Sequence, residues 1–240
     1  MPLSREIRKF LGRFCTDPRL EERLSRLQKE VDFLYAYLDL KKGERQYART
    51  LEEVRPDHLK RYEFAASRIE RGAKVVDAAC GIGYGSFLIG ERAGASVTGI
   101  DISQQALQIA DKYWTSPNTR FLHADCTQTG LPAASFDVAV SFETIEHVPV
   151  APELVAHLYA LLKPGGRLIC STPNEAVIPH SAAKYPHHQR HYTLDEIKSL
   201  LTAAGFAIES IYTQAGSGEQ TVVPGDDGKY LILIAIKPQP

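Results

Sequence analysis

The sequence has few of the features that mark secreted, metal-bound or membrane-spanning proteins. Its 240 residues include four cysteines, Cys15, Cys80, Cys126 and Cys170, which stand far apart and form no CxxC pair. This spacing indicates neither a disulfide framework nor a cysteine metal site. There is also no signal-peptide core and no apolar run near the length of a membrane span. We therefore expect a cytoplasmic protein with reduced thiols.

An excess of charge of one sign is also missing. The 28 lysines and arginines balance the 29 aspartates and glutamates, which gives a formal net charge of −1. Proteins that bind nucleic acid usually carry a basic patch or a basic stripe interleaved with aromatic side chains. We therefore predict no nucleic-acid partner.

The sequence does contain a regular alternation of two patterns from Lys74 onward. Apolar, β-branched runs alternate with segments of helical period, which is typical of an α/β fold with a parallel sheet covered on both faces. We expect strands over residues 74–79, 96–102, 120–124, 136–142, 167–171, 207–212 and 230–236. We expect helices over residues 85–92, 104–114, 151–162 and 194–204. The last two strands are joined only by a glycine- and proline-rich segment, so a long hairpin loop and an antiparallel final strand are predicted.

The first 50 residues follow a different pattern and are predicted to form a helical segment before a domain over residues 51–240. Leucine and valine recur at alternating spacings of four and three from Leu20 to Leu38, as in a short coiled coil. This stripe could pack on its own domain or join two copies into a homo-oligomer. Residues 5–14 combine apolar and basic side chains at helical spacing, which suits either a docking helix or peripheral contact with a membrane.

A glycine-rich turn follows the first predicted strand in "KVVDAACGIGYGS", residues 74–86. Such a turn could hold the pyrophosphate of a dinucleotide, but Ser86 stands where that pattern has its third glycine. The carboxylate of Asp77 would repel a nearby pyrophosphate and would favour a cationic ligand such as S-adenosylmethionine. Asp101, at the end of the next strand, suits the ribose hydroxyls of either ligand. The residues therefore favour S-adenosylmethionine.

Four segments in order resemble the class I S-adenosylmethionine-dependent methyltransferases: "VVDAACGIGYGS", "VTGIDIS", "FLHADCTQTGLPAASFDVAVSFETIEHV" and "LLKPGGRLICSTPN". The resemblance covers residues 74–238. It implies a Rossmann-like, doubly wound sheet of seven strands with the last one antiparallel. The cofactor would be S-adenosyl-L-methionine, and the protein would be an enzyme.

The resemblance also implies which residues would contact this cofactor. Asp77 would lie by the methionine ammonium, directly or through water, and the backbone at Gly81 and Gly83 would approach the methionine closely. Asp101 would accept both ribose hydroxyls, and Asp125 would accept the adenine amino group unless it serves only as a cap or turn residue. The full predicted cofactor set is Asp77, Ala79, Gly81, Gly83, Asp101, Ile102, Asp125, Cys126 and Ser141.

Acidic and imidazole side chains follow the fourth predicted strand in "FETIEHV". His147 lies where the resemblance puts the acceptor, and a histidine there is a candidate general base when the acceptor is a hydroxyl. Glu143 and Glu146 could orient it or contact donor or acceptor. The alternative is that His147 caps or packs the following helix.

A second group of histidines lies in "YPHHQRHYTLDEI", residues 185–197. The H-H-x-x-H spacing lacks the helical frame of a zinc site, so we predict no metal. "STPN" followed by "PHHQRHYT" instead resembles a methyltransferase subgroup whose connection after the fifth strand covers the acceptor. His188 would then act in catalysis, and Arg190, His191 and Tyr192 would bind the acceptor, although His191 departs from the subgroup pattern. An ordinary surface loop is the alternative.

The segments "GERQY" and "DHLKRYEFAASRI" resemble methyltransferases encoded with cell-surface glycan machinery, although "GERQYART" departs from their usual pattern. The acceptor predicted from this block is a sugar hydroxyl of a nucleotide- or lipid-linked glycan, with Arg190 or Arg61 near its phosphate. Three alternatives stay open. They are methylation of a small aromatic or quinone-like metabolite on oxygen or nitrogen, a dinucleotide enzyme, and a cofactor-binding scaffold.

Overall fold

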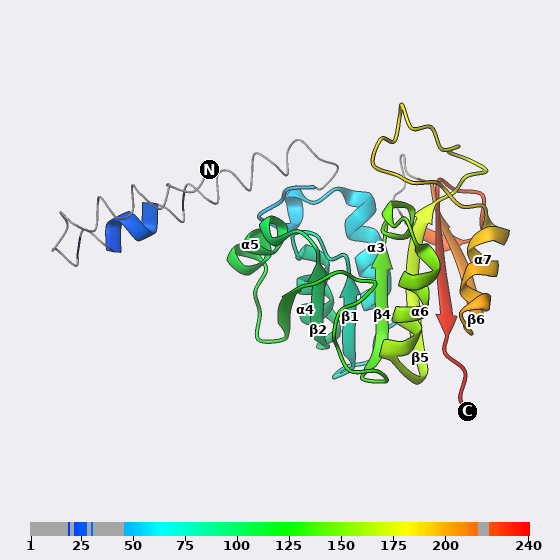
Figure 1. Cartoon of the computed structure of the whole chain (residues 1–240), viewed down its shortest axis with the longest axis horizontal. Helices are drawn as coiled ribbons and strands as arrows, with labels where there is room; N and C mark the ends of the chain where they lie inside the picture. The colour runs from blue at the N-terminus through cyan, green and yellow to red at the C-terminus, as the bar shows by residue number, and fades with distance from the viewer. Residues whose placement is uncertain (1–18, 20–21, 28–29, 31–45, 216–220) are drawn as a thin grey trace.

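The computed structural model describes residues 19, 22–27, 30, 46–215 and 221–240. Their strands form one mixed sheet in the order β3-β2-β1-β4-β5-β8-β6-β7. Helices cover both faces of this sheet (Figure 1). On β1, Val75 packs into the core that includes α3, α4 and α5, whereas Val76 packs into the core that includes α6 and α7. The side chains of one strand thus serve both cores, which explains why the consecutive residues Val75 and Val76 are both apolar.

The strands are β1 Lys74–Ala78, β2 Ser96–Asp101, β3 Thr119–His123, β4 Phe136–Phe142, β5 Leu162–Pro173, β6 Ala207–Gln214, β7 Val222–Pro224 and β8 Tyr230–Ile236. Strands β1 to β5 pair in parallel, and β8 pairs antiparallel with both β5 and β6. The predicted α/β class and the antiparallel last strand are confirmed. The prediction of seven strands is wrong by one, because three residues of the expected hairpin loop pair with β6 as β7. So short a strand carries too few residues for a readable alternation.

The described helices are η1 Leu51–Glu53, α3 Pro56–Ala66, α4 Tyr84–Ala93, α5 Gln104–Tyr113, η2 Ile145–His147, α6 Ala151–Leu161 and α7 Leu194–Ala203. The four predicted helices are α4, α5, α6 and α7. Ser103 caps α5 by accepting a hydrogen bond from the backbone N–H of Ala106, and Thr193 and Glu196 form a capping box on α7. Strand β5 begins at Leu162, five residues before the prediction, and its pairing with β4 is irregular there.

The segment before α3 belongs partly to the core. Ala48 is fully buried, and its carbonyl accepts a hydrogen bond from Trp114 Nε1 at 3.2 Å. Further upstream, residues 19, 22–27 and 30 are helical, and Leu27 is 55% exposed. Most of the predicted coiled-coil stripe and all of residues 5–14 lie outside the described residues. Within the part of the chain that the structure describes, no helix is both long enough and apolar enough to cross a membrane.

Candidate active site

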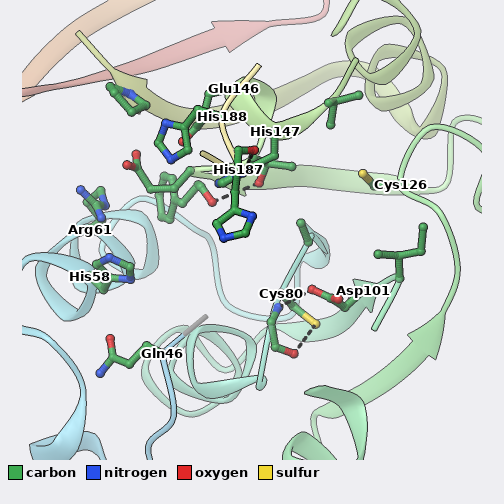
Figure 2. A pocket seen from close by; sticks show the side chains of 18 of the residues that line it. Gln46, His58, Arg61, Cys80, Asp101, Cys126, Glu146, His147, His187 and His188 are labelled. Carbon is green, nitrogen blue, oxygen red and sulfur yellow. Dashed lines mark hydrogen bonds between the residues drawn. The ribbon is translucent and has the colours of Figure 1, made fainter. Parts of the chain in front are cut away.

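A cavity of about 1130 Å³ opens at the carboxyl edge of the sheet. Its wall includes the turns that follow β1, β2, β3 and β4, which the parallel pairing brings to one edge. Helix α3 adds a further side, and the connection between β5 and α7 adds Ile178, Lys184, Tyr185, His187 and His188. In Figure 2, His147, His187 and His188 lie opposite Cys80 and Asp101, with His58 and Arg61 at one side. We call the part around Asp101 the donor side and the part around the histidines the acceptor side.

Asp101 ends β2 with its carboxylate held in place by the backbone. Oδ2 accepts from the N–H of Gly81 at 2.9 Å, and Oδ1 accepts from the N–H of Ser103 at 2.8 Å. Ile102 follows in the cavity wall with 63% of its surface exposed. A fixed carboxylate beside an exposed apolar side chain is an arrangement suited to a ribose and its base. The structure therefore brings two of the predicted cofactor residues together on the donor side.

The glycines of the turn after β1 serve different purposes. Gly81 lines the cavity at φ 57°, and a Cβ there would meet no atom within 4 Å, so its backbone is open to a ligand. Gly83 does not line the cavity, and its Cβ would stand 2.6 Å from the ring of Phe121 and 2.7 Å from Ala110 Cβ. The absence of a Cβ at Gly83 thus leaves room for internal packing, and the predicted approach of its backbone to the methionine stays a prediction. Ala79 lines the cavity at φ 59°, which is strained for a residue with a Cβ.

Asp125 and Cys126 follow β3 in the cavity wall. The Oδ1 atom of Asp125 accepts from both the backbone N–H and the hydroxyl of Thr127, each at 2.8 Å, and these bonds lower the pKa of Asp125. This is the turn geometry that was the alternative reading of Asp125, although the residue also borders the cavity. Burial raises the pKa of Cys126 to about 11, so its thiol is protonated at neutral pH.

Asp77 is fully buried behind the cavity wall. It accepts hydrogen bonds from Ser86 Oγ at 2.6 Å and from Tyr62 Oη at 3.2 Å, and burial raises its pKa to about 7. Tyr62, from α3, lines the cavity where Asp77 does not. Asp77 thus lies behind the cavity wall, and Ser141 is likewise buried outside the wall, so contact of either residue with the cofactor stays a prediction.

Sequence reasoning missed Tyr62, although one signal for it exists. A Cβ at Gly85 would lie 2.1 Å from the Tyr62 ring, so this glycine makes space for the tyrosine to reach Asp77.

Two glutamates follow β4 on the acceptor side. Glu143 lines the cavity, and its Oε1 accepts from Ser171 Oγ at 2.6 Å. Glu146 is fully buried, and its Oε2 accepts from Thr172 Oγ1 at 3.2 Å. Its Oε1 has no hydrogen-bond partner among the described residues. Burial, and then the charge of Glu143, raise the pKa of Glu146 well above its usual range.

His147 and His188 come from different segments and meet edge to face, with ring centroids 4.5 Å apart. His147 Nδ1 lies 3.0 Å from the His187 carbonyl, and His188 Nδ1 lies 2.8 Å from Nε2 of His191. Nδ1 of His191 in turn lies 2.6 Å from the Ile178 carbonyl. A carbonyl oxygen can only accept, so Nδ1 carries the proton in His147 and His191. If His191 is neutral, its Nε2 carries no proton and must accept a hydrogen bond from Nδ1 of His188. In the neutral forms of His147 and His188 the proton is then on Nδ1, and Nε2 is unprotonated.

Three predicted acceptor residues lie outside the cavity wall. His191 is 2% exposed and stands behind His188. Arg190 pairs with Glu196 and stacks over the ring of Tyr192, whose backbone bridges to Asn174. The prediction of direct contact with an acceptor held in this cavity is not supported for Arg190, His191 or Tyr192. His147 Nδ1 lies at hydrogen-bond distance from a backbone carbonyl, that of His187.

Helix α3 contributes a buried cation. Arg61 is 1% exposed and lines the cavity, with Nη1 2.8 Å from Gln214 Oε1 and its guanidinium over the Tyr230 ring. Its Nη2 lies 3.8 Å from Asp57 and has no hydrogen-bond partner within the described ranges. Burial, and then the charge of Arg61, lower the pKa of His58 to about 3, so that this cavity histidine stays neutral.

The mixed, doubly wound sheet with antiparallel β8 next to β5, the carboxylate at the end of β2 and the glycine turn at the same cavity are the arrangement expected of a class I methyltransferase domain. Residues 45–211 match the family described as a methyltransferase domain, and the chain belongs to this family. It is an S-adenosylmethionine-dependent methyltransferase domain with a Rossmann-like fold.

The curated relatives are longer than the segment of each that aligns with this chain. A Mycolicibacterium smegmatis protein named "Probable S-adenosylmethionine-dependent methyltransferase" is 31% identical over 170 residues, which cover 67% of this chain and 65% of the relative. Phosphoethanolamine N-methyltransferase 1 of Arabidopsis thaliana is 34% identical over 147 residues, which cover 58% of this chain and 29% of the relative. The chain thus spans less than two thirds of these relatives.

A solved structure has the same fold. It is Haemonchus contortus phosphoethanolamine N-methyltransferase 2 in complex with S-adenosyl-L-methionine, with a TM-score of 0.59 and 17% identity. The comparison covers 71% of this chain and 50% of that one.

Proposed function

We propose that this protein transfers the methyl group of S-adenosylmethionine to a sugar hydroxyl of a nucleotide- or lipid-linked glycan. The observation that carries this proposal is the composition of the acceptor side, where His147, His188 and Glu143 line one cavity with the buried guanidinium of Arg61. Imidazoles and a carboxylate can hydrogen-bond hydroxyls, and a desolvated guanidinium suits a phosphate. An aromatic or quinone-like acceptor would be expected in a more apolar site.

The donor side fits the cofactor that the family uses. Asp101 offers a carboxylate already held by two backbone N–H groups, Ile102 offers an exposed apolar face, and Gly81 leaves open space. When bound, S-adenosylmethionine supplies a methyl group on a good leaving group. We assign the ribose to Asp101, the adenine to Ile102 and the region of Asp125 and Cys126, and the methionine to the turn at Ala79 and Gly81. Asp77 and Ser141 would act from behind this wall.

The protein's own part in the reaction is alignment and removal of one proton. Holding donor and acceptor in line contributes up to roughly 7 to 11 kcal/mol. His147 would accept the hydroxyl proton at Nε2, because its Nδ1 is held by the His187 carbonyl. General base catalysis of this kind adds about 10² to 10⁴-fold. Glu143 and His188 would position the hydroxyl.

A second candidate is N-methylation of a small phosphorylated amine. The relatives named phosphoethanolamine N-methyltransferases suggest this chemistry. Arg61 could bind the phosphate and Glu143 the amine, since both line the same cavity. An amine needs no strong base once it is neutral, so this reaction would depend less on His147.

The test is transfer of labelled methyl groups from S-adenosylmethionine into a cell extract separated into nucleotide-sugar, lipid-linked glycan, phosphorylated-amine, small organic and macromolecular pools. Label in a glycan pool, reduced at least 100-fold by His147→Ala, is the expected result. Label in the amine pool that survives His147→Ala would favour the second candidate. Label confined to the small organic pool would favour the aromatic or quinone-like acceptor. Cofactor binding without label in any pool would contradict both and favour a scaffold.

A further inference from the structure

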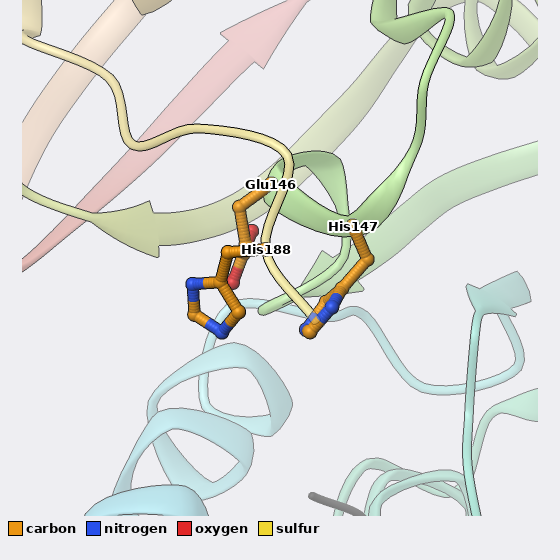
Figure 3. Close-up of side chains that lie close together, drawn as sticks. All are labelled: Glu146, His147 and His188. Atoms are coloured by element: carbon orange, nitrogen blue, oxygen red, sulfur yellow. The ribbon is translucent and has the colours of Figure 1, made fainter. Parts of the chain in front are cut away.

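Glu146, His147 and His188 form a compact cluster on the acceptor side. Each offers one ligand atom, and these atoms all lie within 4.8 Å of one another. Figure 3 shows the two imidazoles and the carboxylate converging from η2 and from the connection after β5. The H-H-x-x-H spacing could not reveal this set, because two of its three members come from residues 145–147.

Two independent observations point to a cation at this cluster. The first is the buried carboxylate atom Oε1 of Glu146, which has no hydrogen-bond partner within the described part of the chain. An unsatisfied buried carboxylate oxygen is costly, so a compensating positive centre beside it would stabilise the fold.

The second observation is the arrangement of the outer partners. Metal-binding histidines usually donate their other ring N–H to a carbonyl or another acceptor, which fixes the tautomer and the ring orientation. His147 Nδ1 faces the His187 carbonyl at 3.0 Å, and His188 Nδ1 faces Nε2 of His191 at 2.8 Å. Thr172 Oγ1 holds the other oxygen of Glu146 at 3.2 Å. All three candidate ligands are thus oriented by neighbours that hold another atom of the same side chain.

We propose that Glu146, His147 and His188 bind one divalent transition-metal ion, with Zn²⁺ as the best fit. Two imidazole nitrogens and one carboxylate oxygen suit zinc and disfavour magnesium, which prefers oxygen ligands. A tetrahedral set with bonds of about 2.0 Å has ligand atoms ~3.3 Å apart, so side-chain rotations that close the separations by up to about 1.5 Å would complete the site. Three protein ligands leave a fourth position open to the cavity for an oxygen ligand. While the ion is bound, His147 Nε2 is a ligand and cannot accept a proton, so the general-base role proposed above for His147 applies to the metal-free protein.

Metal binding can be measured on the full chain without any acceptor. The protein, stripped with chelator, is titrated with Zn²⁺ by calorimetry and with Co²⁺ by visible absorption. We expect one ion per chain and at least a tenfold loss of affinity in Glu146→Gln, His147→Ala and His188→Ala. His187→Ala is the matched control, because this histidine also lines the cavity but its side chain is outside the set. It should retain the affinity.

Three outcomes would overturn the metal site. They are no saturable binding of either ion, equal binding in the three ligand variants, or equal loss in His187→Ala. Thermal unfolding and binding of S-adenosylhomocysteine by each variant check that a loss is not misfolding. Because this readout involves no methyl transfer, its failure leaves the proposed acceptor untouched, and failure of the acceptor assay leaves the metal site untouched.

Discussion

Asp77 illustrates at the scale of one residue how burial changes the titration of a carboxyl group. Its carboxyl is fully buried, and its pKa is raised from 3.8 to about 7. A carboxyl whose pKa is higher in the folded state binds more protons folded than unfolded between these two pH values. Its contribution to the free energy of unfolding is therefore highest below about pH 4, falls as the pH rises to 7, and is level above.

The first prediction concerns Asp77→Asn in the absence of cofactor. The variant cannot titrate, so its stability relative to the wild type should improve by up to about 4 kcal/mol from pH 4 to pH 8. Urea unfolding of both proteins across this range measures the difference, and any loss of hydrogen bonds in the variant cancels in the comparison. Parallel pH profiles would contradict the assigned pKa. If the methionine ammonium lies near Asp77, saturating S-adenosylmethionine should reduce the wild-type dependence.

The site shows what a sequence can predict about single residues. Asp101 was predicted because a position at the end of a parallel strand determines which edge it occupies, whereas Ile102 was predicted from the family resemblance. Tyr62 was missed because it reaches the cavity from α3, which no strand-end argument includes. Arg190 was predicted to contact the acceptor, but it lies outside the cavity wall and pairs with Glu196 of the capping box of α7. The sequence pattern around Arg190 did not indicate this ion pair.

The elements were predicted best where a pattern was long. The continuously apolar strands and the helices with side-chain caps differ from prediction by a residue or two at most ends. β7 and the early start of β5 were not predicted, because both depend on pairing with a distant strand and leave no local pattern. Packing between elements was also not predicted. The sequence did not show that Gly83 packs against Phe121 and Ala110.

The second prediction concerns the contact of α4 with α5 and β3 at Gly83. Gly83→Ala would bring a Cβ within 2.6 Å of Phe121 and 2.7 Å of Ala110, at φ 88°. Overpacking and backbone strain together should cost about 2 to 4 kcal/mol of the free energy of unfolding, measured in urea.

Gly130→Ala is the matched control, because Gly130 has φ 71° and its Cβ would meet no atom within 4 Å. Only backbone strain should then remain, at about 1 kcal/mol. Equal losses in the two variants would show that packing against Phe121 is not the reason for the glycine.

At the scale of the whole molecule, the helical residues before the domain raise the question of a partner. Leu24 and Leu27 belong to the predicted coiled-coil stripe, and Leu27 is 55% exposed in the single chain. Arg26 and Glu30 form an exposed i,i+4 pair at 3.4 Å, which is typical of a solvent-facing side of such a helix. An apolar stripe beside a charged side is the pattern that joins two copies.

The third prediction is that this stripe holds the protein as a homo-oligomer. Leu24→Lys combined with Leu27→Lys in the full chain should shift the mass measured by light scattering to that of one chain. Ser25→Lys adds one positive charge off the stripe, against two in the double variant, and should leave the oligomer intact. A wild type that is already a monomer would contradict self-association, and loss of thermal stability in the double variant would then favour docking of the helix on its own domain. Unchanged assembly in the double variant would place the contact elsewhere.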